Sequence, residues 1–189
     1  MSADGIVVRP SREGDVAQIA AIYGYHVLHG LASFEEVPPD IDEFASRRRD
    51  ILALGLPYLV AERSGSVIGY CYAGPYRTRS AYRLTVEDSI YIDGAEVGRG
   101  LGRALLATLL DRCGELGYRQ MVAVIGGSET WPSIRLHAAL GFTQVGLLPA
   151  VGFKFGSWVD IVLMQRALGP GGTMPPAEIS SINQEKPHE

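Results

Sequence analysis

A glycine-rich segment between two patterned stretches constrains this chain more than any other feature. Residues 89–92, Ser-Ile-Tyr-Ile, end a stretch with a strand pattern, and Gly98, Gly100 and Gly102 follow at every second position. From Leu101 onward, apolar residues recur every three or four positions, as they do on one face of a helix. The sequence therefore predicts a strand that passes through a glycine turn into an amphipathic helix.

The start of such a helix is suited to binding phosphate. Its first N–H groups have no partner within the helix, and the helix dipole places partial positive charge there. Glycines let a phosphate approach these groups, and Arg99 and Arg103 add full charges. The segment contains neither Gly-Lys-Ser nor Gly-Lys-Thr, which excludes a P-loop, and Arg103 and Leu105 stand where a dinucleotide motif needs its third glycine. The diphosphate of coenzyme A remains, and a plain core-packing turn is the alternative.

Length and composition bound the class of protein. The chain has 189 residues, 47% of them hydrophobic, and a net charge of −4. This length suits one domain with a substantial core, and the charge argues against a nucleic-acid partner. Cys71 and Cys113 lie in apolar segments, which favours buried thiols in a reducing compartment over a disulfide. With no membrane-spanning or signal-peptide pattern, we expect a cytoplasmic protein without a membrane partner.

Seven strands and four helices are expected along the chain. Strand patterns cover residues 5–9, 58–63, 66–73, 84–92, 121–125, 142–148 and 158–165. Helical patterns cover residues 15–28 and 40–54, a stretch from 101 to the glycines at 114 and 117, and residues 132–140. Residues 151–157 are expected to form a loop. This order predicts one α+β domain over residues 1–168, and residues 169–189 read as a polar tail rich in Gly, Pro and Ser.

Several motifs together resemble one family. The strand, glycine turn and helix, followed by Ser-Ile-Arg-Leu-His-Ala-Ala-Leu-Gly-Phe at 133–142, resemble the GNAT superfamily of acetyl-CoA-dependent N-acetyltransferases. Residues 73–77, 81–82, 85–92, 122–126 and 152–160 resemble its phosphinothricin and methionine sulfoximine (or sulfone) acetyltransferase group. The resemblance covers about residues 5–166. It implies the GNAT fold, a mixed sheet of about seven strands with about four helices, acetyl-CoA as co-substrate without a metal, and a homodimer.

Two positions depart from the family pattern. Val97 stands where the glycine motif usually carries Gln or Arg, so only a backbone contact is retained. Thr130 stands where many members carry an Asn that contacts the cofactor arm, and a hydroxyl matches an amide only in part. We still expect acetyl-CoA to bind, and the expected contacts are Ile90, Tyr91, Ile92, Val97, Gly98, Arg99, Gly100, Leu101, Gly102, Arg103, Thr130 and Ser133.

Glu87 is the candidate general base. It lies in Leu-Thr-Val-Glu-Asp-Ser, within a predicted strand, where a carboxylate with a purely structural role is costly. The resemblance assigns the matching glutamate as the base that takes the amine proton, directly or through water, and so places it against the substrate. The alternative is a carboxylate paired with Arg77, Arg79 or Arg83. Asp88 is expected to point to the opposite face and to be structural.

His137 and a backbone N–H complete the expected chemistry. Acetyl transfer needs a donor for the developing oxyanion, and the departing thiolate is helped by a proton. An N–H group within residues 90–92 is the expected oxyanion donor. His137 matches a family histidine, and its near-neutral titration suits either a proton donor or a cofactor contact. A partly buried structural histidine is the alternative.

The substrate contacts are expected from two loops and the last strands. Arg77 and Arg79, with Tyr82 nearby, make a fork that suits a carboxylate or phosphinate, and the family holds its amino-acid substrate at the matching positions. A solvated basic loop is the alternative. Phe34 is expected to wall the pocket, or else to plug its own loop. Lys154 belongs to the last-strand signature and is expected to complete the pocket, from the same or a second subunit.

The sequence thus predicts direct acetyl transfer, in a ternary complex, to the α-amino group of a small amino acid of the phosphinothricin or methionine sulfoximine type. An acetyl-cysteine intermediate is not expected, because Cys71 and Cys113 lie in no nucleophile motif. A protein or peptide N-acetyltransferase is one alternative, against which the twin arginines argue. A non-catalytic acyl-CoA sensor is the other, and the presence of Glu87 argues against it.

Overall fold

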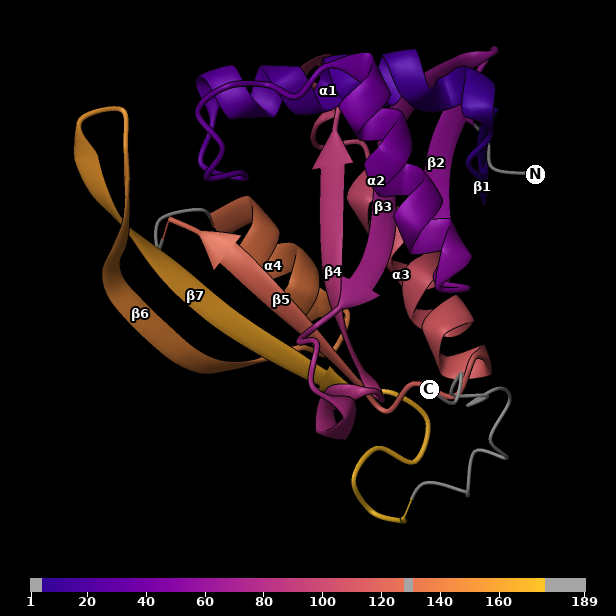
Figure 1. Cartoon of the computed structure of the whole chain (residues 1–189), viewed down its shortest axis with the longest axis vertical. Coiled ribbons are helices and arrows are strands. Elements are labelled where there is room, and N and C mark those ends of the chain that lie inside the picture. The colour runs from indigo at the N-terminus through magenta and orange to yellow at the C-terminus, as the bar shows by residue number, and fades with distance from the viewer. Residues whose placement is uncertain (1–4, 128–130, 176–189) are drawn as a thin grey trace, which may run out of the picture.

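A seven-stranded mixed sheet in the order β1-β2-β3-β4-β5-β7-β6 organises the molecule (Figure 1). The computed structural model describes residues 5–127 and 131–175. The strands are β1 (Ile6–Pro10), β2 (Tyr58–Arg63), β3 (Ser66–Pro75), β4 (Thr85–Ile92), β5 (Gln120–Gly126), β6 (Thr143–Lys154) and β7 (Ser157–Ala167). The helices are α1 (Val16–His29), α2 (Ile41–Ala53), α3 (Leu101–Glu115) and α4 (Trp131–Ala139), with 3-10 turns at η1 (Glu13–Asp15), η2 (Ser80–Tyr82) and η3 (Gly94–Glu96).

Helices cover both faces of the sheet, and each face has its own core. On one face, α3 buries its leucine stripe against β2, β3 and β5, and α4 packs at the edge of the same cluster. On the other face, α1 and α2 pack on aromatic residues of β2, β3 and β4, with Tyr70 at the centre of stacked tyrosine rings. The leucine periodicity read from the sequence therefore corresponds to the buried face of α3.

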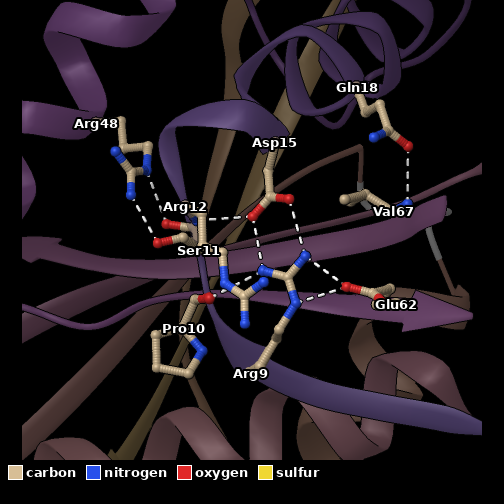
Figure 2. A network of polar contacts seen from close by, with 9 residues as sticks. All are labelled: Arg9, Pro10, Ser11, Arg12, Asp15, Gln18, Arg48, Glu62 and Val67. Carbon is tan, nitrogen blue, oxygen red and sulfur yellow. Dashed lines mark hydrogen bonds and ion pairs between the residues drawn. The ribbon is translucent and has the colours of Figure 1, made fainter. Parts of the chain in front are cut away.

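A polar network attaches the first helices to the edge of the sheet (Figure 2). Arg9 of β1 donates to both carboxylate oxygens of Asp15, at 2.7 and 2.9 Å, and to Glu62 of β2 at 2.6 Å. The hydrogen bond and charge of Arg9 lower the pKa of Asp15. Buried Arg48 of α2 donates to the hydroxyl and carbonyl oxygens of Ser11, at 2.8 and 2.6 Å. These contacts hold α1 and α2, and thus the loop between them, against the sheet.

Strands β4 and β5 separate partway along their length. They pair in parallel from Thr85–Gln120 to Asp88–Ala123, and no later pairs follow within the described residues. On its other side, β4 stays paired with β3 as far as Ile92. Figure 1 shows the carboxyl ends of the two strands pointing apart. The last residues of β4 therefore have an edge that β5 does not cover.

The predicted loop at residues 151–157 is wrong. β6 continues to Lys154 and β7 begins at Ser157, so a two-residue turn, Phe155 and Gly156, joins them. Both turn residues have positive φ, as the right-handed twist of a tight hairpin requires. A register shift between Leu148 and Gly152 bends β6, and the hairpin extends away from the rest of the sheet (Figure 1).

The structure also tests the expected elements, the two cysteines and the C-terminal segment. The seven strands and four helices are confirmed, and Cys71 and Cys113 are buried free thiols, as expected. Among the residues described, no helix combines the length and apolar character that crossing a membrane requires. Of the expected tail, residues 169–175 form turns, and Arg119 donates to the carbonyl oxygens of Gly171 and Pro175. Residues 176–189 lie outside the described part of the chain.

Candidate active site

A cavity of about 470 Å³ lies where β4 and β5 separate. Its walls come from residues 87–91 of β4, residues 123–126 of β5, Ser133 and His137 of α4, and residues 31–35 of the α1–α2 loop. Five consecutive residues of β4 line it, although side chains of a strand alternate between faces. The cavity begins where the pairing of β4 with β5 ends, at Asp88 and Ala123, so it adjoins both the last paired residues and the uncovered edge that follows.

Glu87 is a half-buried carboxylate in the cavity wall. Burial raises its pKa above the ordinary glutamate value, the charge of Arg77 acts in the opposite direction, and the charge of Asp88 raises it further. None of the ion pairs between described residues involves Glu87, so the alternative of a carboxylate neutralised by a neighbouring arginine is not observed. A carboxylate in this setting suits proton abstraction near neutral pH.

Asp88 and His137 form a buried pair in the same wall. The Nε2 atom of His137 lies 3.0 Å from Oδ2 of Asp88, and each side chain is 2% exposed. The Nδ1 atom of His137 lies 2.8 Å from the carbonyl oxygen of Ser133. Burial opposes a charged ring, but the hydrogen bond and charge of Asp88 outweigh it, so the pKa of His137 is raised. The sequence did not indicate this partnership, because 49 residues separate the two side chains.

The uncovered edge of β4 contains part of the expected cofactor contacts. Ile90 and Tyr91 border the cavity, and Ser133 faces it from α4. Ile92 lies beyond the cavity, and its carbonyl oxygen is 2.8 Å from Nε2 of His26. Thr130 lies outside the described residues, so its expected contact has no structural counterpart here.

The glycine turn leads into α3 as the sequence predicts. Gly98 and Gly100 have φ values of +86° and +78°, which residues with a side chain rarely adopt. A Cβ at either position would meet no atom within 4 Å, so open space adjoins the backbone. Gly100 is the N-cap of α3 without a side-chain cap, and Arg99 and Arg103 are exposed beside it. Arg99 Nη1 lies 3.5 Å from a carboxylate oxygen of Glu96.

Phe34 lines the cavity from the α1–α2 loop and rests on two glycines that the sequence reasoning missed. A Cβ on Gly152 of β6 would lie 2.2 Å from the Phe34 ring. One on Gly126 of β5 would lie 2.7 Å from the ring and 2.3 Å from the carbonyl oxygen of Leu31. These positions admit only a hydrogen while the ring keeps this place. Little in the sequence signalled this seat, because Gly126 followed a predicted strand and Gly152 lay in the segment expected to be a loop; a glycine within a strand, as both prove to be, sometimes marks close backbone approach.

Lys154 is buried at the end of β6, outside the cavity wall. Its Nζ donates to the carbonyl oxygens of Gly30, at 2.9 Å, and Ser33, at 2.6 Å. Burial lowers its pKa, and the charges of Glu36 and Glu35 oppose that effect. This geometry makes Lys154 a tether of the loop that bears Phe34, and it places the ammonium on backbone rather than in the cavity.

Arg77, Arg79 and Tyr82 lie in the exposed β3–β4 loop, and none of them borders the cavity. Arg77 donates to the carbonyl oxygen of Tyr76 at 2.8 Å, and its guanidinium lies 4.3 Å from the centre of the Tyr76 ring. The rings of Tyr76 and Tyr82 make an edge contact at 5.7 Å. These contacts group Arg77 with Tyr76 and Tyr82, and the fork of Arg77 with Arg79 stays a prediction. The charge of Arg77 acts on the cavity by lowering the pKa of Glu87.

Comparison with known proteins identifies the family. A model of the acetyltransferase (GNAT) domain matches residues 8–163. The chain belongs to the GNAT acetyltransferase family. Among solved GNAT structures, a phosphinothricin acetyltransferase from Sinorhizobium meliloti in complex with AcCoA is 48% identical, with a TM-score of 0.89 over 92% of this chain and 94% of that one. The expected GNAT fold is therefore confirmed.

Curated GNAT relatives are similar over most of their length. A phosphinothricin N-acetyltransferase from Alcaligenes faecalis is 54% identical over 169 residues, which are 89% of this chain and 86% of that protein. An L-methionine sulfoximine/L-methionine sulfone acetyltransferase from Salmonella typhimurium is 40% identical over 163 residues, 86% of this chain and 95% of that protein. Both the family and the narrower group named by the resemblance are thus represented among its relatives.

Proposed function

We propose that this chain is an acetyl-CoA-dependent N-acetyltransferase that acetylates the α-amino group of a small amino acid by direct attack in a ternary complex. The observation that carries the proposal is the half-buried carboxylate of Glu87, which makes no ion pair with any described residue, in the cavity where β4 and β5 separate in a member of the GNAT family. The names of relatives at 54% and 40% identity support phosphinothricin, methionine sulfoximine and methionine sulfone as substrates.

Glu87 is the proposed general base. An amino acid reaches the site as an ammonium, which has no lone pair with which to attack a carbonyl carbon. A general base removes that proton most effectively when its pKa lies near the pH at which the enzyme works. Burial brings the pKa of Glu87 toward that range, and the cavity leaves the carboxylate accessible to a substrate or a bridging water. Glu87 therefore touches the substrate as well as its proton.

The residues present fit coenzyme A. When bound, acetyl-CoA supplies the acetyl group as a thioester. Ile90, Tyr91 and Ser133 are proposed to contact its arm along the uncovered edge of β4, where a backbone N–H of residues 90–92 is the proposed oxyanion donor. The unpaired N–H groups at the start of α3 and the open space at its glycine turn suit the diphosphate. The remaining proposed contacts are Ile92, Val97, Gly98, Arg99, Gly100, Leu101, Gly102, Arg103 and Thr130.

The substrate's polar groups are proposed to meet Arg77, Arg79 and Tyr82. The effect of Arg77 on the pKa of Glu87 supports this, because it places one guanidinium within electrostatic range of the base. Phe34 is the proposed apolar wall of the substrate site. Lys154 contributes to that site through the loop, since its ammonium holds the segment that carries Phe34.

We further propose that the chain forms a homodimer through the β6–β7 hairpin. Val145, Phe153, Phe155 and Trp158 expose more than half of their surface there, and large exposed apolar patches mark association sites. A second copy of this chain is the proposed occupant of this apolar surface. The two buried free thiols support a reducing compartment, and we propose the cytoplasm as the location. Residues 1–168 are proposed as the catalytic domain.

Thiol release from acetyl-CoA, measured across a panel of amino acids and analogues, tests the proposed function. We expect release with phosphinothricin, methionine sulfoximine or methionine sulfone, and weaker release with peptides that present only an N-terminus. Coenzyme A binding without release with any amine would instead indicate a sensor. Preference for peptides would identify a protein N-acetyltransferase.

A further inference from the structure

The contacts of His137 decide how many protons its ring carries. A backbone carbonyl oxygen only accepts hydrogen bonds, so the Nδ1 atom, 2.8 Å from the carbonyl oxygen of Ser133, carries a hydrogen. If the ring were neutral, Nε2 would then present a lone pair. That atom lies 3.0 Å from a carboxylate oxygen of Asp88, which is also an acceptor when ionised. Two acceptors do not face one another at this distance, so a proton lies between them.

Two other arrangements would leave the ring with a single proton. In the first, a protonated Asp88 would donate to Nε2, but an imidazole is a stronger base than a carboxylate, so the shared proton belongs on the ring. The second involves Ser133. The hydroxyl of Ser133 could donate to Nδ1, and Nε2–H could then donate to Asp88. The hydroxyl oxygen is 3.5 Å from Nδ1, at the outer limit of a hydrogen bond, whereas the carbonyl oxygen is 2.8 Å away. In this arrangement the Nδ1 lone pair would face the carbonyl oxygen of Ser133 at the shorter distance, and its hydrogen bond would come from the more distant hydroxyl. The shorter contact favours the doubly protonated ring.

The surroundings of Asp88 also call for a cation. Its other carboxylate oxygen is buried with no hydrogen-bond partner among the described residues. The titratable groups coupled to its charge are Glu87 on β4, Cys71 on β3 and Cys113 on α3. Burial raises the pKa of both thiols, and Asp88 adds to that effect, so they stay uncharged. Within the described part of the chain, the ring of His137 is the basic group that lies within ion-pair distance of this carboxylate.

We propose that Asp88 is a positioning residue that holds His137 as an imidazolium, with one ring N–H directed at Asp88 and the other at the carbonyl oxygen of Ser133. The pair thus stores one proton in the cavity wall beside Glu87. His137 consequently does not compete with Glu87 for the amine proton. It serves as the acid of the site when one of these two hydrogen bonds opens and that N–H turns to the departing thiolate. This last consequence rests on the proposed acetyltransferase function, whereas the proton count does not.

Nitrogen NMR of histidine-labelled protein counts these protons directly. In the wild-type chain we expect both ring nitrogens of His137 to show imidazolium shifts at neutral pH. In Asp88→Asn we expect the ring to be neutral at neutral pH, because burial then acts without the opposing carboxylate. Asp111→Asn, which removes an exposed carboxylate from α3, is the matched control and leaves the His137 signal unchanged. His137→Gln assigns the signal.

The wild-type titration tests the proposal even where Asp88→Asn does not fold. A neutral wild-type ring at neutral pH, with a hydrogen on only one of its two nitrogens, overturns it. So does an imidazolium that persists unchanged in a folded Asp88→Asn chain. For the catalytic consequence, we expect the alkaline limb of the kcat profile to move to lower pH in Asp88→Asn, with a loss on the order of 10²-fold on that limb. An unmoved limb would remove His137 as the acid, and absence of any acetyl transfer would refute the proposed function while the NMR result stands.

Discussion

At the scale of single residues, the chemistry depends on two neighbours that strand alternation would have separated. Glu87 and Asp88 are adjacent, and the alternating pattern placed them on opposite faces. Both border the cavity, because β5 leaves β4 at Asp88 and exposes the strand edge. Their roles differ through their partners. Glu87 is half-buried and makes no ion pair with any described residue, whereas Asp88 is paired with His137.

Replacing Glu87 by Gln should lower kcat on the order of 10²-fold, because an amide does not accept the amine proton. The raised pKa of Glu87 sets the pH dependence: the base is lost as pH falls through a value above the ordinary glutamate pKa of about 4.3, so the acid limb of kcat/KM lies above that value. We expect Glu87→Gln to lose this limb. Steady-state rates over a pH series measure it, with exposed Glu115→Gln as control. Turnover equal to that of the control would remove Glu87 from the mechanism.

At the scale of elements, the α1–α2 loop is placed by contacts from three directions. Tyr23 of α1 bonds the hydroxyl of Ser33 at 2.8 Å, Lys154 of β6 holds two of its carbonyl oxygens, and Phe34 rests on the backbone of β5 and β6. A loop without regular structure gains its order from such tertiary contacts rather than from its own sequence. These contacts explain how a loop without regular secondary structure forms a defined wall of the cavity.

Lys154→Met should therefore disturb the position of the α1–α2 loop more than the stability of the whole fold. Two carbonyl oxygens lose a charged donor, which costs about 1–3 kcal/mol of unfolding free energy. We expect KM for the amino acid to rise several-fold, with KM for acetyl-CoA little changed, because the loop borders the substrate end of the cavity. Initial-rate kinetics with each substrate varied in turn measure the split. Arg49→Met, at an exposed position of α2, is the control for loss of one positive charge. An equal rise in both KM values would contradict a local role.

At the scale of the whole molecule, the β6–β7 hairpin exposes several large apolar side chains close together in the sequence. It lies at the opposite edge of the sheet from β1, and it projects from the body in Figure 1. Trp158 is 68% exposed and makes an edge contact with Phe153 at 5.3 Å. Aromatic side chains displayed together in this way are typical of the centre of a protein interface.

Trp158→Asp should shift the chain from dimer to monomer, because it places a charge in the proposed apolar interface. Sedimentation at a series of protein concentrations measures the shift. Val7→Asp, at an exposed position on β1 at the far edge of the sheet, is the matched control and should leave the association state unchanged. A wild-type chain that sediments as a monomer at all concentrations would contradict the proposed dimer.

The sequence by itself determined the elements and the family. Hydrophobic periodicity is a local property, so the leucine stripe of α3, the glycine turn and the buried run of β5 could be predicted from residues that are close in the chain. The motif at 133–142 and the Thr-Val-Glu strand sufficed for the resemblance to GNAT enzymes, which the family match over residues 8–163 confirms. Glu87 was found because a carboxylate inside a strand is itself unusual.

Only the tertiary structure decided how the site is assembled. The pairing of Asp88 with His137 spans 49 residues, and the tether from Lys154 to Ser33 spans 121. The ring of Phe34, in a loop, packs on Gly126 of β5 and Gly152 of β6, which are distant in the sequence. Contacts at such separations leave no periodic trace in a single sequence, because they depend on where the sheet opens and which strands end there. The separation of β4 from β5 is therefore the feature that converts predictable elements into a cavity lined by the proposed base Glu87, the Asp88–His137 pair and Phe34.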